Sequence, residues 1–152
     1  MKVLMVCLGN ICRSPIAEGV LKSKLHKYGI NGFVDSAGVL SEHAGESPDE
    51  RAVFISKKNG TDISGQIARQ FTTADFEDFD LILTMDSSVH NSIIRKATNS
   101  LQKSKVSLFL EYAGNTSGSN VPDPYFGGPE GFVQVYKLIE DGCERIAAKM
   151  KS

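Results

Sequence analysis

Two residues, Cys7 and Arg13, have the potential for phosphate chemistry. Cys7 directly follows an apolar run at residues 3–6, and Arg13 lies six positions later. Between them lie Gly9 and Asn10, two residue types that readily adopt positive φ angles. We expect this segment to curl back, so that successive backbone N–H groups face inward and form an anion-binding nest. The Arg13 guanidinium, a planar fork of donors, would close this nest around two oxygens of a phosphate group.

The nest is expected to open directly into a helix. Ser14 is a good N-cap and Pro15 a good first helical residue, so the positive end of the helix dipole would point into the nest. A thiol in this position, beside an arginine, ionises more readily than a free one, and we expect Cys7 to be a thiolate at neutral pH. The thiolate can attack phosphorus and form a cysteinyl-phosphate, while the loop amides and Arg13 stabilise the oxygens that carry charge. The predicted phosphate-binding loop consists of Leu8, Gly9, Asn10, Ile11, Cys12, Arg13 and Ser14.

Other phosphate-binding loops have different requirements. A Walker loop needs Gly-Lys followed by Ser or Thr, and a dinucleotide fingerprint needs three spaced glycines; the segment after the first apolar run has neither. The alternative without function is a buried cysteine at a strand end and a surface arginine. The residues around the pair favour the phosphate-binding loop, because a strand precedes it and a helix follows.

The chain resembles the low-molecular-weight protein tyrosine phosphatases over nearly its whole length. The specific parts are residues 6–14, with Pro15 and Glu18 after them, and the motif Asp-Pro-Tyr-Phe-Gly-Gly at residues 123–128. Further similar segments lie between them, at residues 35–38, 48–52, 68–70 and 79–86. The resemblance implies a phosphomonoester hydrolase that acts on protein phosphotyrosine and small aryl phosphates through a cysteinyl-phosphate, with no cofactor and no metal.

Asp123 is the candidate general acid. It lies between Pro122 and Pro124, which restrict the backbone and favour a loop that presents the side chain. A carboxylic acid there can protonate the phenolate oxygen as it leaves, a contribution of roughly 10²–10⁴-fold, and can later activate water as a base. An Asp-Pro pair alone indicates an ordinary turn. Its combination with the cysteine loop and the family motif favours catalysis.

The resemblance also implies a substrate cleft and a supporting network. Tyr125 and Phe126 would form one wall, against which a planar phenol packs, and Phe126 is the better candidate for a core anchor. Asn10 would hold the strained loop and Ser36 would support it, so that the nest is preorganised. Ser14 completes this supporting group, because its hydroxyl can donate to the Cys7 sulfur.

The chain departs from the family pattern in three places. Many members carry an aromatic residue where this chain has Glu42, followed by His43, and we expect a polar, acidic wall there. A histidine often precedes the Ala-Arg-Gln segment, but here the residue is Gln66. Protein-arginine phosphatases with this fold tend to carry threonine at the position of Ile11. Since an apolar Ile11 in the cleft packs against an aromatic ring and cannot bond a guanidinium, we expect phosphotyrosine to be preferred over phosphoarginine.

The three cysteines do not form a disulfide framework and fit a reducing, cytoplasmic environment. Cys12 is either a redox partner that traps oxidised Cys7 as a disulfide or a small buried side chain behind the loop, and the sequence leaves both open. Cys143 lies on an apolar helix stripe and is predicted to be an unreactive core thiol. The histidines show no metal-ligand spacing with the cysteines. We expect His26 and His90 to face solvent.

Length and charge bound the remaining possibilities. A chain of 152 residues fits one phosphatase domain over residues 1–152, and 17 basic residues balance 18 acidic ones. There is no basic stripe for nucleic acid, no signal peptide and no apolar segment near the ~20 residues that span a bilayer. We expect a cytoplasmic monomer or weak homodimer without nucleic-acid or membrane partners. It would bind phosphotyrosine proteins or small phosphomonoesters, inorganic phosphate and oxyanion inhibitors.

Three other functions fit the sequence less well. Arsenate reductases share the loop but relay oxidation through further cysteines, and none occurs between Cys12 and Cys143. A phosphocarrier subunit of a sugar transport system also places a cysteine after its first strand, but it needs neither Arg13 nor Asp123. A phosphotyrosine-binding module without turnover is disfavoured, because no catalytic group is missing.

Alternating strands and helices must position these residues, and they predict a parallel sheet covered on both faces. Strands are expected at residues 2–6, 33–36, 81–84 and 106–110. Helices are expected at residues 15–28, from Ser47 (with Pro48 at N1) to Gly60, at 87–96 and at about 129–150, with a helical turn at 72–76 and a loop at 112–121. The resemblance implies an α/β, flavodoxin-like three-layer sandwich with strand order 2-1-3-4. A ligand would then bind beyond the carboxyl ends of the strands, where Cys7 lies.

Overall fold

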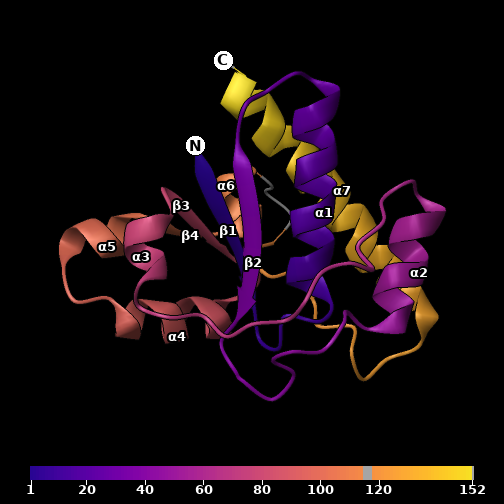
Figure 1. The fold of residues 1–152 in the computed structure, drawn as a ribbon, viewed down its shortest axis with the longest axis horizontal. Coiled ribbons are helices and arrows are strands. Elements are labelled where there is room, and N and C mark those ends of the chain that lie inside the picture. The colour runs from indigo at the N-terminus through magenta and orange to yellow at the C-terminus, as the bar shows by residue number, and fades with distance from the viewer. Residues whose placement is uncertain (115–117, 152) are drawn as a thin grey trace.

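The computed structural model describes residues 1–114 and 118–151. Its centre is a parallel sheet of four strands in the order β2-β1-β3-β4, which confirms the predicted topology (Figure 1). The strands are β1 (Lys2–Cys7), β2 (Phe33–Gly38), β3 (Leu81–Thr84) and β4 (Val106–Leu108). Except for Lys2, every residue of β1 is buried, because helices cover the sheet on both faces.

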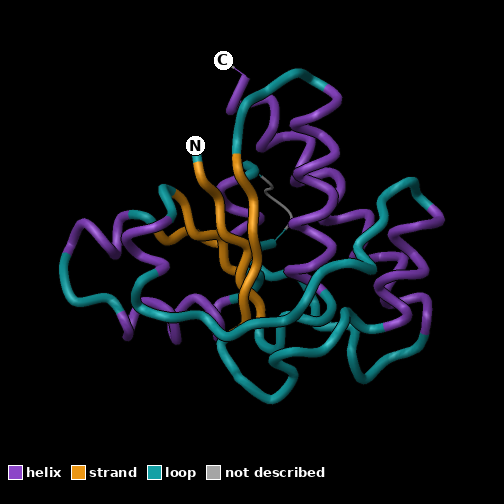
Figure 2. Tube along the Cα trace, in the orientation of Figure 1, coloured by secondary structure: helices purple, strands orange, loops and turns teal. Residues whose placement is uncertain are grey.

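The helices form the two outer layers, as Figure 2 shows in purple on either side of the orange strands. One face is covered by α1 (Arg13–Lys27), α2 (Glu50–Lys58), α6 (Phe109–Tyr112) and α7 (Pro129–Lys151). The other face is covered by α3 (Asp75–Asp78) and α4 (Ser87–Lys96), and α5 (Ser100–Ser104) lies on the same side. A hydrophobic core lies on each face of the sheet, and successive side chains of β1 point into alternate cores. Val3 and Met5 pack in the core under α1 and α7, and Leu4 and Val6 pack in the core under α3 and α4.

The N-termini of two helices differ from the prediction. Helix α1 begins at Arg13 with Cys12 as its N-cap, so Ser14, expected to be the cap, lies in the first turn. Helix α2 begins at Glu50, and its N-cap is Asp49, whose carboxylate accepts from the Arg51 backbone N–H at 2.9 Å. The C-termini agree with the prediction, because a glycine with positive φ, Gly29 or Gly60, follows each helix.

The region after β3 contains more helix than expected. β4 ends at Leu108, because the apolar run that follows it forms the short helix α6. Such short apolar runs do not distinguish a strand from a helix. The helical turn expected at 72–76 is α3, at 75–78, and α5 was not predicted. The predicted loop at 112–121 includes residues 115–117, which lie outside the described residues.

The two helix histidines have different environments. His26 is exposed, as predicted. His90 is half-buried and its Nδ1 lies 3.1 Å from the Thr84 hydroxyl, so the expectation that it faces solvent was wrong. No helix in the described parts of the chain is long and apolar enough to cross a membrane.

Candidate active site

The loop at residues 7–14 lies at the carboxyl end of β1. Asn10 adopts a left-handed conformation with φ 60°, whereas Gly9 does not have a positive φ, in contrast to the expectation. A Cβ on Gly9 would lie 3.1 Å from Cδ2 of His43, so a side chain there would require the His43 ring to shift slightly. On the neighbouring strand, a Cβ on Gly38 would lie 2.9 Å from the Gly9 carbonyl carbon. The loop thus packs directly against the end of β2.

The peptide groups of the loop point in two directions. Loop carbonyls point outward and accept from flanking segments: Cys7 O from Val39 N at 3.0 Å, Leu8 O from Leu40 N at 2.9 Å and Ile11 O from Asp49 N at 2.8 Å. Within the described residues, the N–H groups of Gly9, Ile11 and Cys12 have no protein acceptor. These donors can therefore bind an anion.

The Cys7 sulfur is close to two donors. The Asn10 N–H donates to it at 3.3 Å, and the Ser14 hydroxyl lies 3.0 Å away. This contact explains why Ser14 does not cap α1. The Ser14 hydroxyl contacts the Cys7 sulfur and the Asn10 amide instead. No side chain hydrogen-bonds to the N-terminus of α1.

The Arg13 side chain is only 3% exposed and is surrounded by acceptors. Its Nη1 donates to Asp86 Oδ2 at 2.6 Å and to the Val121 carbonyl at 3.0 Å, and its Nη2 lies 3.6 Å from Asp123 Oδ2. Burial alone would lower the pKa of Arg13, but the negative charges of Cys7, Asp86 and Asp123 raise it above its ordinary value. The guanidinium therefore stays charged beside the Cys7 sulfur.

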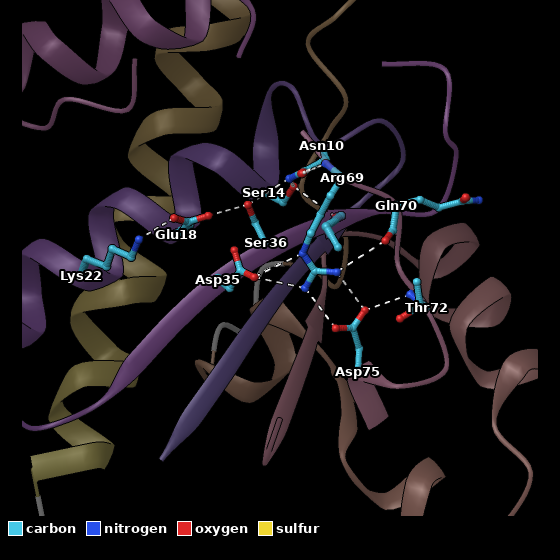
Figure 3. A network of polar contacts seen from close by, with 11 residues as sticks. Asn10, Ser14, Glu18, Lys22, Asp35, Ser36, Arg69, Gln70, Thr72 and Asp75 are labelled. Atoms are coloured by element: carbon cyan, nitrogen blue, oxygen red, sulfur yellow. Dashed lines mark hydrogen bonds and ion pairs between the residues drawn. The ribbon is translucent and has the colours of Figure 1, made fainter. Parts of the chain in front are cut away.

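A buried polar network supports the loop from behind (Figure 3). The Asn10 amide donates to the hydroxyls of Ser14 at 2.8 Å and Ser36 at 2.9 Å. Ser36 in turn donates to Glu18 at 2.6 Å, and Lys22 donates to the other Glu18 oxygen at 2.6 Å. Every hydroxyl and carboxylate in this chain of contacts has a partner, so the loop conformation is held without unpaired buried groups.

Arg69 anchors the same network on its other side. Its backbone N–H donates to the side-chain oxygen of Asn10, Oδ1, at 3.0 Å. Its guanidinium bridges two carboxylates, Asp35 at 3.1 Å and Asp75 at 3.0 Å (Figure 3). Both Asn10 hydrogens and its oxygen are thus engaged, which fixes the one strained residue of the loop.

A cleft opens above the Cys7 sulfur. It is lined by the loop, by the segment after β2 and by the segment before α7: Cys7, Leu8, Gly9, Ile11, Cys12, Arg13, Leu40, Glu42, His43, Asp123, Tyr125 and Phe126. The cleft residues expected from the sequence all line it. The wall after β2 is less acidic than expected, because the apolar Leu40 and the ring of His43 lie beside Glu42.

The aromatic pair forms the opposite wall, but in an unexpected way. The ring centroid of Tyr125 lies 6.1 Å from that of His43 and 4.9 Å from that of Phe126, which meets it edge-on. Phe126 is 92% exposed and Tyr125 is 36% exposed. The expectation that Phe126 anchors the loop in the core was therefore wrong.

Asp123 is presented at the cleft, with 36% of its side chain exposed. Its Oδ1 accepts from the Tyr125 N–H at 3.1 Å, which leaves Oδ2 directed toward Arg13. The structure thus brings the three predicted catalytic residues, Cys7, Arg13 and Asp123, to one cleft.

The other two cysteines differ from Cys7 in their surroundings. Burial, followed by the nearby charges of Asp49 and Cys7, raises the pKa of Cys12 well above its ordinary value. Burial does the same to the pKa of Cys143, which is in the core, as predicted. Both are neutral thiols at physiological pH. In the described residues, no cluster of three or more histidine, cysteine or carboxylate side chains could hold a metal ion.

Sequence reasoning missed three residues of the site. The sequence assigns Asp86 no catalytic role, although its position at the carboxyl end of β3 places it at the ligand-binding edge. Glu18 was noted only as part of the family resemblance. Arg51 received no role, because nothing in the local sequence indicates that it contacts residues 125–127.

Comparisons with known proteins agree with this geometry. The family model for low molecular weight phosphotyrosine protein phosphatase matches residues 2–152. The enzyme of that name from Schizosaccharomyces pombe is 42% identical over 143 residues, 92% of this chain and 90% of that protein. A protein tyrosine phosphatase structure from Entamoeba histolytica has a TM-score of 0.93 at 35% identity, covering 99% of this chain and 97% of that one. A Drosophila arginine phosphatase structure has a TM-score of 0.92 at 36% identity, covering 100% and 99%. This chain belongs to the low molecular weight phosphotyrosine protein phosphatase family.

Proposed function

We propose that this enzyme hydrolyses phosphotyrosine in proteins, and small aryl phosphates, through a cysteinyl-phosphate on Cys7. The observation that carries the proposal is the environment of the Cys7 sulfur. The Asn10 N–H and the Ser14 hydroxyl contact it, and the buried, charged guanidinium of Arg13 lies nearby. Free backbone N–H groups complete the ring of donors around the position that a phosphate would occupy.

The first step transfers the phosphoryl group to the enzyme. The Cys7 thiolate attacks phosphorus, the bond to the aryl oxygen breaks, and that oxygen takes the proton of Asp123. In the second step, water attacks phosphorus and gives a proton to the Asp123 carboxylate. The sulfur–phosphorus bond then breaks, and the Ser14 hydroxyl stabilises the departing thiolate. Inorganic phosphate, and oxyanions that resemble it, should bind the same ring of donors.

The cleft walls favour an aromatic substrate. Tyr125, Phe126 and His43 offer ring surfaces against which a phenyl ring can pack, and Ile11 adds an apolar contact at the loop. Phosphoarginine is the second candidate, because an arginine phosphatase is among the similar structures. The side chain of Ile11 supports the first candidate, since it cannot hydrogen-bond a guanidinium.

Turnover of p-nitrophenyl phosphate in the presence of EDTA tests the proposal. The wild-type enzyme should retain full activity, and Cys7→Ser should lose steady turnover, because a hydroxyl without an adjacent base is a poor nucleophile. The serine variant should still bind phosphate, since the donors and Arg13 remain. Cys143→Ala, which removes a thiol in the core, serves as the matched control and should keep its turnover. Steady turnover by Cys7→Ser would rule out the covalent mechanism.

A further inference from the structure

We propose that Arg51 is a positioning residue that holds the Asp123 loop above the phosphate-binding loop, so that the acid is in place when substrate binds. The inference rests on the proposed role of Asp123 as general acid. Arg51 lies in the first turn of α2 and does not line the cleft. Its effect must therefore pass through the loop that it contacts.

The Arg51 guanidinium binds the backbone just after Asp123. Its Nη2 donates to the Tyr125 carbonyl at 2.9 Å, and its Nη1 donates to the Gly127 carbonyl at 3.1 Å. The same group lies over two rings, 4.6 Å from the Phe132 centroid and 5.7 Å from that of Tyr125. Two main-chain bonds and the Tyr125 ring contact hold this loop, while the contact with Phe132 of α7 holds the guanidinium itself.

Asp49 fixes the guanidinium in turn. Its Oδ1 accepts from Arg51 Nε and its Oδ2 accepts from Nη2, both at 3.0 Å, a bidentate pair. Burial alone would raise the pKa of Asp49, but the bonds from Arg51 lower it below its ordinary value, so the carboxylate stays ionised at neutral pH. The backbone N–H of Asp49 donates to the Ile11 carbonyl at 2.8 Å. The pair therefore connects the phosphate-binding loop on one side to the acid loop on the other.

The acid loop has few other attachments. Among the described residues, the acid loop (residues 123–127) is anchored firmly on its N-terminal side, where the Val121 N–H donates to the Met85 carbonyl at 2.8 Å and the Val121 carbonyl accepts from Arg13. Beyond the ion pair of Arg13 with Asp123 and the buried Pro124 ring, the other hydrogen bonds that residues 123–127 make with the described parts of the chain stay within the loop, so on its C-terminal side Arg51 is the main polar anchor. Phe126 is exposed to solvent and adds no core anchor. A displacement of about 1 Å can cost on the order of 10²-fold in rate, so losing the Arg51 contacts at Tyr125 and Gly127 should be felt at Asp123 although Val121 stays anchored.

Leaving-group dependence separates a positioning role from a merely structural one. An enzyme whose general acid is misplaced loses most activity on substrates with poor leaving groups, because these depend most on protonation of the departing oxygen. We expect Arg51→Met to lower kcat/KM for phenyl phosphate on the order of 10-fold more than for p-nitrophenyl phosphate. Inhibition by inorganic phosphate should change less than about threefold, because the ring of donors is intact. Arg95→Met, the same substitution at an exposed arginine of α4, is the control and should match the wild type.

Two further variants keep the test decisive if Arg51→Met folds poorly. Asp49→Asn preserves the helix cap, because an amide oxygen also accepts from the backbone, but it weakens the hold on the guanidinium. Asp49→Asn should make the plot of log kcat/KM against leaving-group pKa steeper than in the wild type, but less steep than in Arg51→Met. Arg51→Lys should resemble Arg51→Met, since an ammonium cannot make the forked contact.

Asp123→Asn and Cys7→Ser together distinguish failure of this inference from failure of the proposed function. If Asp123→Asn has the wild-type slope, Asp123 is not the acid and the positioning role falls with it, whereas the cysteinyl-phosphate mechanism falls only if Cys7→Ser turns over. If Asp123→Asn steepens the slope but the folded Arg51 and Asp49 variants do not, only the positioning role is overturned. In the Asp123→Asn background, Arg51→Met should add no further steepening, because no proton remains to be positioned.

Discussion

Asp86 binds Arg13 and caps a helix with the same carboxylate. Its Oδ2 accepts from Arg13 Nη1 at 2.6 Å, and its Oδ1 accepts from the Val89 N–H at 2.8 Å at the start of α4. Because α4 follows β3 directly, the cap fixes the carboxylate at the carboxyl edge of the sheet. The buried guanidinium of Arg13 thus meets a counter-ion that is already held in place, which offsets part of the cost of its burial.

The first prediction separates these two roles of Asp86. Asp86→Asn keeps the helix cap but loses the charge that pairs with Arg13. We expect the free energy of unfolding in urea to fall by about 1.5–3 kcal/mol, the usual contribution of a hydrogen bond to a charged group. Inorganic phosphate should recover part of this loss, since a bound anion supplies the missing counter-ion. Unchanged stability without phosphate would show that the ion pair contributes nothing.

Oxidation tests the role of Cys12. Mild peroxide should inactivate the wild-type enzyme reversibly, because a disulfide from Cys7 to Cys12 would stop oxidation at a reducible stage. Cys12→Ser should lose activity that dithiothreitol restores less completely. The measurement is recovered activity after matched exposure, with Cys143→Ser as the control. Equal recovery in all three proteins would contradict a protective disulfide.

Substrate class is tested at Ile11. The wild-type enzyme should have a higher kcat/KM for phosphotyrosine than for phosphoarginine. Ile11→Thr should shift the ratio of the two values toward phosphoarginine, since a hydroxyl can hydrogen-bond the guanidinium. The matched control is Ile11→Val, which keeps an apolar, branched side chain. A wild-type preference for phosphoarginine would overturn the assignment.

Alkaline pH should destabilise the protein through its buried thiols. The pKa of Cys143 is raised by burial, whereas an unfolded thiol titrates near about 8.5. Its contribution is therefore complete below that pH and is lost as pH rises above it, by up to about 1.4 kcal/mol per pH unit. We expect the free energy of unfolding to fall less steeply in Cys143→Ala than in the wild type between about pH 9 and 10.5. Parallel curves would contradict the raised pKa.

The sheet and the loop were predictable from the sequence because their signals are local. An apolar strand, Cys7, Arg13 and a following helix lie within one short segment. The strand order also followed from the family resemblance. Helix N-termini were less predictable, because capping rules consider only the adjacent backbone. Ser14 is a good cap by those rules, but the Cys7 sulfur and Asn10 bind its hydroxyl instead.

Contacts between distant segments could not be predicted. Arg51 is separated by 74 positions from Tyr125, and Arg13 by 73 from Asp86. Neither pairing leaves a pattern in composition or periodicity. The exposure of Phe126 could not be predicted either, because Phe is among the residue types most often buried and the local sequence does not show which side of the loop faces the core.

The close approach of Gly38 to Gly9 has a consequence for attempts to transplant this loop into other proteins. The loop segment is short and contiguous, which makes it attractive for grafting onto a different parallel sheet. A host with any side chain at the end of the adjacent strand would push the grafted backbone outward, because a Cβ there would meet Asn10 N at 3.0 Å and Leu8 O at 3.0 Å. The portable unit is therefore two neighbouring strand ends, one bearing the cysteine and the other bearing a glycine.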